Sequence, residues 1–77
     1  MEINDFVNFY FDHDRFRKKI MEILEENNLT ITDIAPSIGY ADRTLFNYLK
    51  KYQDSRFIAG ALCERFNLNP KNFMRDN

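Results

Sequence analysis

The feature that most constrains this 77-residue chain is one glycine, Gly39, which stands between two short stretches of helical periodicity. Glycine adopts a left-handed backbone conformation at little cost and therefore suits a tight turn between helices. Ahead of the turn, Thr30 is a good N-cap, and Asp33, three residues later, completes a variant of the capping box. With only two Gly and two Pro residues and no low-complexity run, the chain should form a compact helical domain.

The first of the two helices should run from the cap to about Ile38, and Pro36 makes it awkward. If Thr30 is the cap, the proline lies inside the helix, where it removes a backbone donor and crowds the preceding turn. If Thr32 is the cap, the proline falls in the first turn, where it is tolerated. In either case the helix should be short and distorted.

The second helix should start at Ala41 or Asp42 and run to Lys50. Its apolar positions recur at helical spacing and should face the core: Leu45, Tyr48 and Leu49. The opposite face should be exposed, with charged, polar and aromatic side chains: Asp42, Arg43, Phe46, Asn47 and Lys50. An arginine and an asparagine on one exposed helix can form bidentate hydrogen bonds to guanine and adenine, respectively.

Further helices are expected on both sides of this pair. The clearest pattern runs from Arg15 to Asn27, with an apolar face of Phe16, Ile20, Ile23 and Leu24 and with Arg17 on the polar face. Ser55 should cap a helix over residues 56–66, whose apolar side is Phe57, Ile58, Ala61, Leu62 and Phe66. Asn69 should cap a last short helix that begins at Pro70 and returns Phe73 and Met74 to the core. We predict an all-α, compact bundle of five or six helices without a strand.

An acidic, aromatic arm precedes this bundle at residues 1–14. It has no Lys or Arg and carries Glu2, Asp5, Asp12 and Asp14, whereas residues 15–77 hold eleven basic and eight acidic side chains. A short amphipathic helix is expected over residues 5–11, and a single helix continuing through this region remains an alternative. Asp12 or Asp14 should cap the next helix. His13, between two aspartates, is read as an exposed linker residue whose protonated form is favoured.

The apolar stripe of the arm leaves two interpretations open. Its members share helical spacing: Ile3, Phe6, Val7, Tyr10 and Phe11. They could pack on the domain, or they could form a binding surface for a dimer partner or another protein. We place the boundary of the arm after residue 14 and assign residues 15–77 to the helical domain.

Residues suited to metal binding or catalysis are scarce. One cysteine and one histidine, Cys63 and His13, are too few for a zinc site, and Cys63 cannot form an internal disulfide. Because Cys63 lies among apolar residues, we expect a buried core thiol. The sequence shows no nucleophile–base pair, carboxylate dyad or phosphate loop, so neither an enzyme nor a cofactor is expected. The lack of a signal peptide or long apolar span predicts a cytoplasmic protein that does not enter a membrane.

The chain resembles the phage-repressor and Cro-like helix-turn-helix family over roughly residues 20–74. The matching residues are Leu29-Thr30, Ile34-Ala35, Ile38-Gly39, Leu45, Tyr48, Ala61-Leu62 and Phe66-Asn67-Leu68-Asn69-Pro70. A more local resemblance, to the helix-turn-helix of the arabinose-regulator family, covers Ile31–Ala35, Gly39–Asp42, Phe46 and Leu49–Lys51. The first resemblance implies a lambda-repressor-like five-helix core, binding to operator DNA, often as a homodimer, and no cofactor.

By position in the motif, the resemblance also assigns the DNA contacts. The groove-facing residues would be Asp42, Arg43, Phe46 and Asn47, and the phosphate contacts would be Thr30, Thr32, Lys50 and Lys51. The expected function is a small DNA-binding transcriptional regulator that places residues 41–50 in the major groove of double-stranded operator DNA. The alternative is a modulator with the same fold that binds a repressor or another protein through its acidic aromatic surface. The net charge of −1 leaves this second reading open.

Overall fold

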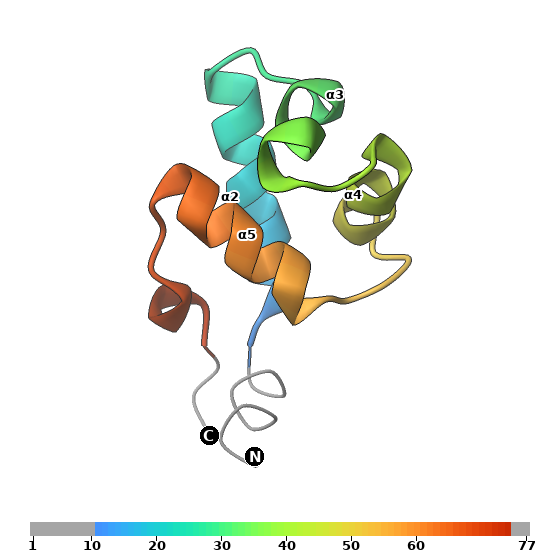
Figure 1. The fold of residues 1–77 in the computed structure, drawn as a ribbon. Coiled ribbons are helices and arrows are strands. Elements are labelled where there is room, and N and C mark those ends of the chain that lie inside the picture. The colour runs from blue at the N-terminus through green and yellow to red at the C-terminus, as the bar shows by residue number, and fades with distance from the viewer. Residues whose placement is uncertain (1–10, 75–77) are drawn as a thin grey trace.

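The computed structural model describes residues 11–74, which form four α-helices and two short 3-10 helices (Figure 1). In chain order these are α2 (His13–Glu26), α3 (Ile31–Ile34), η1 (Ala35–Ile38), α4 (Asp42–Leu49), α5 (Arg56–Phe66) and η2 (Pro70–Phe73). The prediction of an all-α fold is confirmed for this part of the chain, where the only β feature is an isolated bridge between Phe11 and Met74. No helix of residues 11–74 is long and apolar enough to span a membrane.

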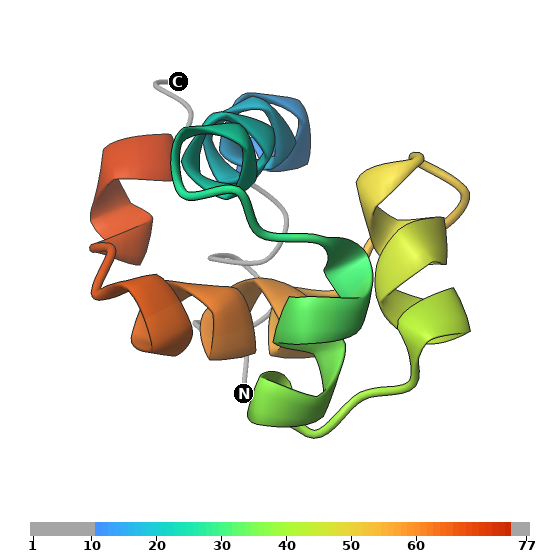
Figure 2. The same ribbon diagram turned by 90° about the horizontal axis from the view of Figure 1, so that it is seen from above.

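Helix α2 lies across α5, and together they form the centre of the molecule (Figures 1 and 2). The helix begins two residues earlier than predicted because Asp12 is its N-cap, and the Asp12 carboxylate accepts a hydrogen bond from the backbone amide of Arg15 at 3.1 Å. Phe16 and Ile20, predicted to be apolar core positions, are completely buried. The chain turns away from α2 at Asn27, as expected.

Two predictions for α2 are wrong, because His13 and Arg17 are buried. His13 is a helical residue with 8% of its surface exposed, and Arg17 is only 4% exposed. Both lie on the same stripe as Ile20 and Leu24, at successive spacings of four, three and four residues, which is one face of an α-helix. This face packs against α4 and α5, so both polar side chains are carried into the interior.

The segment around Gly39 folds largely as predicted. The capping box of Thr30 and Asp33 starts α3, which ends after one turn, and Pro36 then falls in the first turn of the 3-10 helix η1. Gly39 has a φ of 80°, the left-handed conformation that the turn requires. Helix α4 follows from Asp42, with its predicted inward residues buried: Leu45, Tyr48 and Leu49.

Helix α5 confirms its predicted cap and buries Ile58 and Leu62 as predicted, but one predicted core residue is exposed. The Ser55 hydroxyl accepts a hydrogen bond from the backbone amide of Ile58 at 3.2 Å. Phe57, predicted to face the core, is 70% exposed, because the buried face of α5 is rotated toward Ala59 and Cys63. The prediction of a buried Cys63 is confirmed, and burial raises the pKa of its thiol.

The structure gives Phe11 a place in the core rather than in an exposed arm. Its ring packs edge-on against the rings of His13 and Phe16, and next to it the backbone amide of Asp12 donates to the carbonyl of Phe73 at 2.7 Å. Of the two interpretations left open for the apolar stripe, Phe11 follows packing on the domain, because its side chain is buried. The predicted domain boundary after residue 14 falls inside α2. The other arm residues, Ile3, Phe6, Val7 and Tyr10, lie outside the described residues, as does most of the predicted helix over residues 5–11.

Candidate functional site

A shallow groove separates the start of α3 from the exposed face of α4. It is lined by Ile31, Thr32, Asp42, Arg43 and Phe46. Four of these five residues were predicted from the sequence as DNA contacts, so the groove brings together half of the eight predicted residues. The groove is open and accommodates a broad contact surface rather than an enclosed small molecule.

Two of the selected residues bind each other across this groove. The Thr32 hydroxyl donates a hydrogen bond to the Asp42 carboxylate at 3.0 Å, and both side chains are exposed. This contact connects the first turn of α3 with the first turn of α4. The contact occupies one carboxylate oxygen of Asp42 but leaves the negative charge, which would still repel a nearby phosphate.

Thr30 is occupied by its role as a helix cap. Its hydroxyl donates to the Asp33 carboxylate at 3.0 Å, and it accepts a hydrogen bond from the backbone amide of Asp33 at 3.2 Å. The backbone amide of Thr30 also donates to the same carboxylate at 2.8 Å, which is the main reason that the pKa of Asp33 lies below its usual value. Thr30 thus contributes to the start of α3, and a phosphate contact would compete with the cap.

Arg43, Phe46 and Lys50 form the exposed part of α4. The Lys50 ammonium lies 5.8 Å from the centroid of the Phe46 ring, within the range of a cation–π contact. Arg43 makes no hydrogen bond, ion pair or ring contact with any other residue of 11–74. Its five donors are therefore available on the surface.

The two remaining predicted contacts are Asn47 and Lys51. Asn47 is half-buried at the edge of the exposed face of α4. Lys51, after the end of α4, lies 3.5 Å from the Asp14 carboxylate of α2. Its backbone has a φ of 69°, which is unusual for a residue with a side chain.

Behind α4, a buried arginine makes contacts that the sequence analysis missed. The guanidinium of Arg17 donates to the backbone carbonyls of Tyr48 and Gln53, with the second distance 3.0 Å. It also forms ion pairs with Asp54 and with Asp14, the latter at 3.1 Å, and its central carbon lies 4.6 Å from the centroid of the Tyr48 ring. We call Arg17 with its four partners the Arg17 network. The network attaches the last turn of α4 and the following loop to α2.

His13 adds a second contact from α2 to α4. Its Nδ1 atom is 2.8 Å from the Tyr48 hydroxyl, and the two rings meet edge to face. Burial is the main reason that the pKa of His13 is lowered, although nearby carboxylates act in the opposite direction. This corrects the expectation that the flanking aspartates favour protonated His13. Burial also raises the pKa of Tyr48, so the hydroxyl stays protonated at neutral pH.

Comparisons of the chain with protein-family models, curated proteins and solved structures found no match. Within residues 11–74, no three His, Cys, Asp or Glu side chains gather into a group that could hold a metal ion. The candidate site therefore consists of the exposed face of α4, the adjoining groove and the buried contacts behind them.

Proposed function

We propose that the protein is a small DNA-binding transcriptional regulator in which α3, η1, the Gly39 turn and α4 act as a helix-turn-helix. In such units the second helix lies in the major groove and the first crosses the phosphate backbone. Here α4 would enter the groove of operator DNA. A lambda-repressor-like arrangement, a cytoplasmic location and a homodimeric state form part of the same proposal.

The observation that carries this proposal is the position of Arg43. It projects from the exposed face of α4, one residue after the helix begins, and it has no partner among residues 11–74. Residues near the N-terminus of a recognition helix reach base edges, and arginine can hydrogen-bond guanine through two atoms. An arginine that folding does not use is consistent with such a role.

The rest of the exposed face supplies weaker contacts. Lys50 is an exposed cation at the end of α4, where it can neutralise a phosphate. Phe46 offers an apolar edge that can touch the methyl group of thymine, and the half-buried Asn47 has a side-chain amide suited to adenine. Lys51 would have to leave Asp14 to contact DNA. We therefore expect binding to depend mostly on Arg43 and Lys50.

The test is selection of binding sites from random DNA duplexes at low salt, followed by measurement of affinity for the enriched sequence. Arg43→Ala should lower the preference for that sequence by ~1–3 kcal/mol, because one base contact is lost. Lys50→Ala should weaken binding to all duplexes and lower the slope of affinity against salt concentration by about one.

Lys71→Ala is the matched control for Lys50→Ala, because it removes an exposed lysine from η2. Helices η2 and α4 lie on opposite sides of the α2–α5 pair (Figures 1 and 2). This control should leave affinity and salt slope unchanged. The proposal is wrong if no sequence is enriched, or if Arg43→Ala leaves the preference for the enriched sequence intact.

A protein-binding modulator is the second candidate, and exposed aromatic residues favour it. Tyr52, within the connection from α4 to α5, is 74% exposed, and Phe57, in the first turn of α5, is 70% exposed. Tyrosine and phenylalanine are enriched at protein interfaces. In this reading the partner would be a repressor or another protein, and the random-duplex selection would enrich no sequence.

A further inference from the structure

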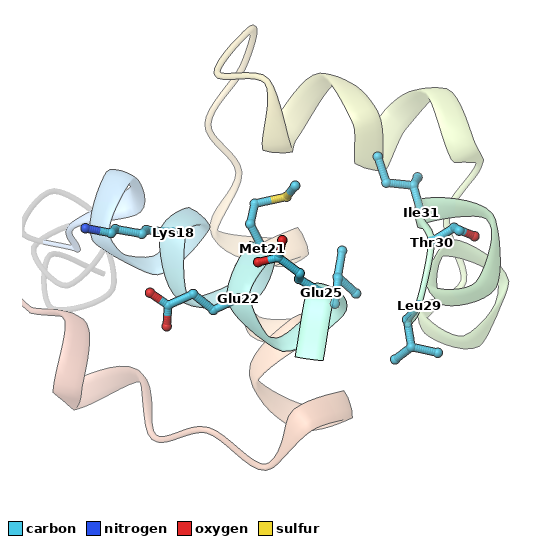
Figure 3. A pocket seen from close by; sticks show the side chains of 8 residues that line it. Lys18, Met21, Glu22, Glu25, Leu29, Thr30 and Ile31 are labelled. Atoms are coloured by element: carbon cyan, nitrogen blue, oxygen red, sulfur yellow. The ribbon is translucent and has the colours of Figure 1, made fainter. Parts of the chain in front are cut away.

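A second groove lies along the exposed side of α2, away from the buried contacts that hold α4. Its lining residues come from α2 and from the segment that leads into α3: Lys18, Met21, Glu22, Leu24, Glu25, Leu29, Thr30 and Ile31 (Figure 3). Most of the apolar contribution comes from Met21, which is 45% exposed, and from the half-buried Leu29 and Ile31. We call this surface the α2 groove.

The charges along the α2 groove change sign from one end of the helix to the other. Exposed lysines, Lys18 and Lys19, stand in the first half of α2, whereas Glu22, Glu25 and Glu26 are exposed in the second half. Figure 3 shows Lys18, Glu22 and Glu25 in succession along the helix. None of the three side chains forms a hydrogen bond or ion pair within the described part of the chain. The groove therefore presents charges without partners on both sides of the apolar Met21.

We propose that a second copy of this chain docks on the α2 groove, with the two α2 helices antiparallel around a twofold axis near Met21. A twofold interface uses the same patch on both subunits, so the patch must be complementary to itself. In the antiparallel arrangement, Lys18 of each copy lies beside Glu22 and Glu25 of the other, and the two Met21 side chains meet. A surface of one sign would not have this property.

Charge complementarity is the reason to choose a second copy over an unrelated protein. An unrelated protein would need its own negative and positive groups in the reverse order over the same two helical turns. A second copy of this chain presents that order whenever its α2 helix runs antiparallel to the first. The inference assigns a surface to the homodimeric state of the proposed function. It does not rest on DNA binding, because none of the charged residues of the α2 groove belongs to the exposed face of α4. Dimer formation would also bury apolar surface that a small domain leaves exposed.

Exchange of charges between the two ends of the groove tests the proposal on the full chain. Lys18→Glu and Glu25→Lys each place like charges opposite one another twice in a dimer. Each single variant should raise the dimer dissociation constant by about tenfold, measured by analytical ultracentrifugation at low salt over a range of concentrations. An equimolar mixture of the two variants pairs opposite charges again, and so does the double variant. Both should recover dissociation constants close to that of the unchanged chain.

Lys71→Glu and Glu64→Lys are the matched controls, because they make the same charge changes on η2 and α5. They should leave the dissociation constant unchanged, and circular dichroism should show that all variants remain folded. A chain that stays monomeric at every concentration would overturn the proposal. So would a dimer that the single variants do not weaken, because association would then use another surface.

Discussion

Two arginines on neighbouring helices show how differently the two sides of α4 are used. Arg17 lies behind α4 with 4% of its surface exposed, and its guanidinium binds two backbone carbonyls and two carboxylates. Arg43 lies on the opposite, exposed face and has no partner among residues 11–74. The same side chain is therefore committed to folding in one place and available for binding in the other.

The difference between the two arginines indicates what α4, a helix of only eight residues with one exposed face, requires. Such a short helix is not stable in isolation, so its position must come from tertiary contacts. Leu45 and Leu49 supply apolar packing, and the Arg17 network holds the C-terminal end of α4 in place. The exposed face can then carry side chains that contribute nothing to stability.

Replacement of each arginine by methionine should separate the two roles most strongly. Arg17→Met keeps much of the apolar packing but removes the guanidinium from the two carbonyls and two aspartates that it binds. We expect a loss of about 3 kcal/mol in the free energy of unfolding, measured with urea, because a buried charged hydrogen-bond network is broken. The aspartates are largely exposed and regain water, which keeps the loss at the lower end of the range for buried ion pairs.

Arg43→Met is the matched control and should change the free energy of unfolding by no more than about 0.5 kcal/mol, as is usual for an exposed residue without partners. Equal losses in the two variants would contradict the distinction between the two faces of α4.

Tyr48→Phe should produce a smaller loss on the buried side. The ring and its contact with Arg17 remain, but the hydrogen bond with His13 disappears and leaves a buried ring nitrogen without that partner. A loss of about 1 kcal/mol in urea unfolding is expected. Tyr52→Phe removes a hydroxyl from an exposed tyrosine and should not measurably change the free energy of unfolding. A similar loss in Tyr52→Phe would show that the loss in Tyr48→Phe does not come from the hydrogen bond with His13.

The smallest effect is expected from pH, through His13. Its pKa in the folded protein lies below the ordinary value of 6.5, mainly because of burial, with Arg17 lowering it further and Asp54, Asp14 and Asp12 raising it. Well above pH 6.5 neither the folded nor the unfolded state binds the proton. As the pH falls below this value, the unfolded chain binds a proton first, so the free energy of unfolding decreases until the folded state also protonates.

Thermal melts between pH 7.5 and 5.5 should therefore show a lower melting temperature at the acid end. His13→Gln should lose most of this dependence, because the group that titrates in this range is removed. If the variant and the unchanged chain melt in parallel across the range, His13 is not responsible.

The sequence predicted the helices of residues 11–74 and most of their caps because the signals are local, although α2 begins two residues earlier than predicted and α3 ends after one turn. Asp12, Thr30, Ser55 and Asn69 cap helices through hydrogen bonds within three residues, and the turn at Gly39 depends on one backbone angle. The exposed positions of Arg43 and Lys50 also followed directly from helical spacing.

Contacts between helices were the part that the sequence analysis missed. Residue type placed Arg17 and His13 on the surface, although their spacing to Ile20 and Leu24 placed both on the buried face. The helical spacing indicates the buried face correctly. A buried guanidinium also needs acceptors, however, and those of Arg17 lie more than thirty positions away in the sequence, at Tyr48, Gln53 and Asp54. Residue type also misplaced Phe57, in the opposite direction: its apolar side chain predicts a core position, but α5 turns it outward.

Lys51 has a left-handed backbone conformation and also an ion pair, and the two favour different residues at this position. A side chain in this conformation strains the chain by ~1 kcal/mol, which a glycine would relieve. Glycine, however, would remove both the ion pair with Asp14 and one of the cations next to the exposed end of α4. Lys51→Gly is therefore a natural substitution for raising the thermal stability of this chain. The more stable variant would have less positive charge beside α4.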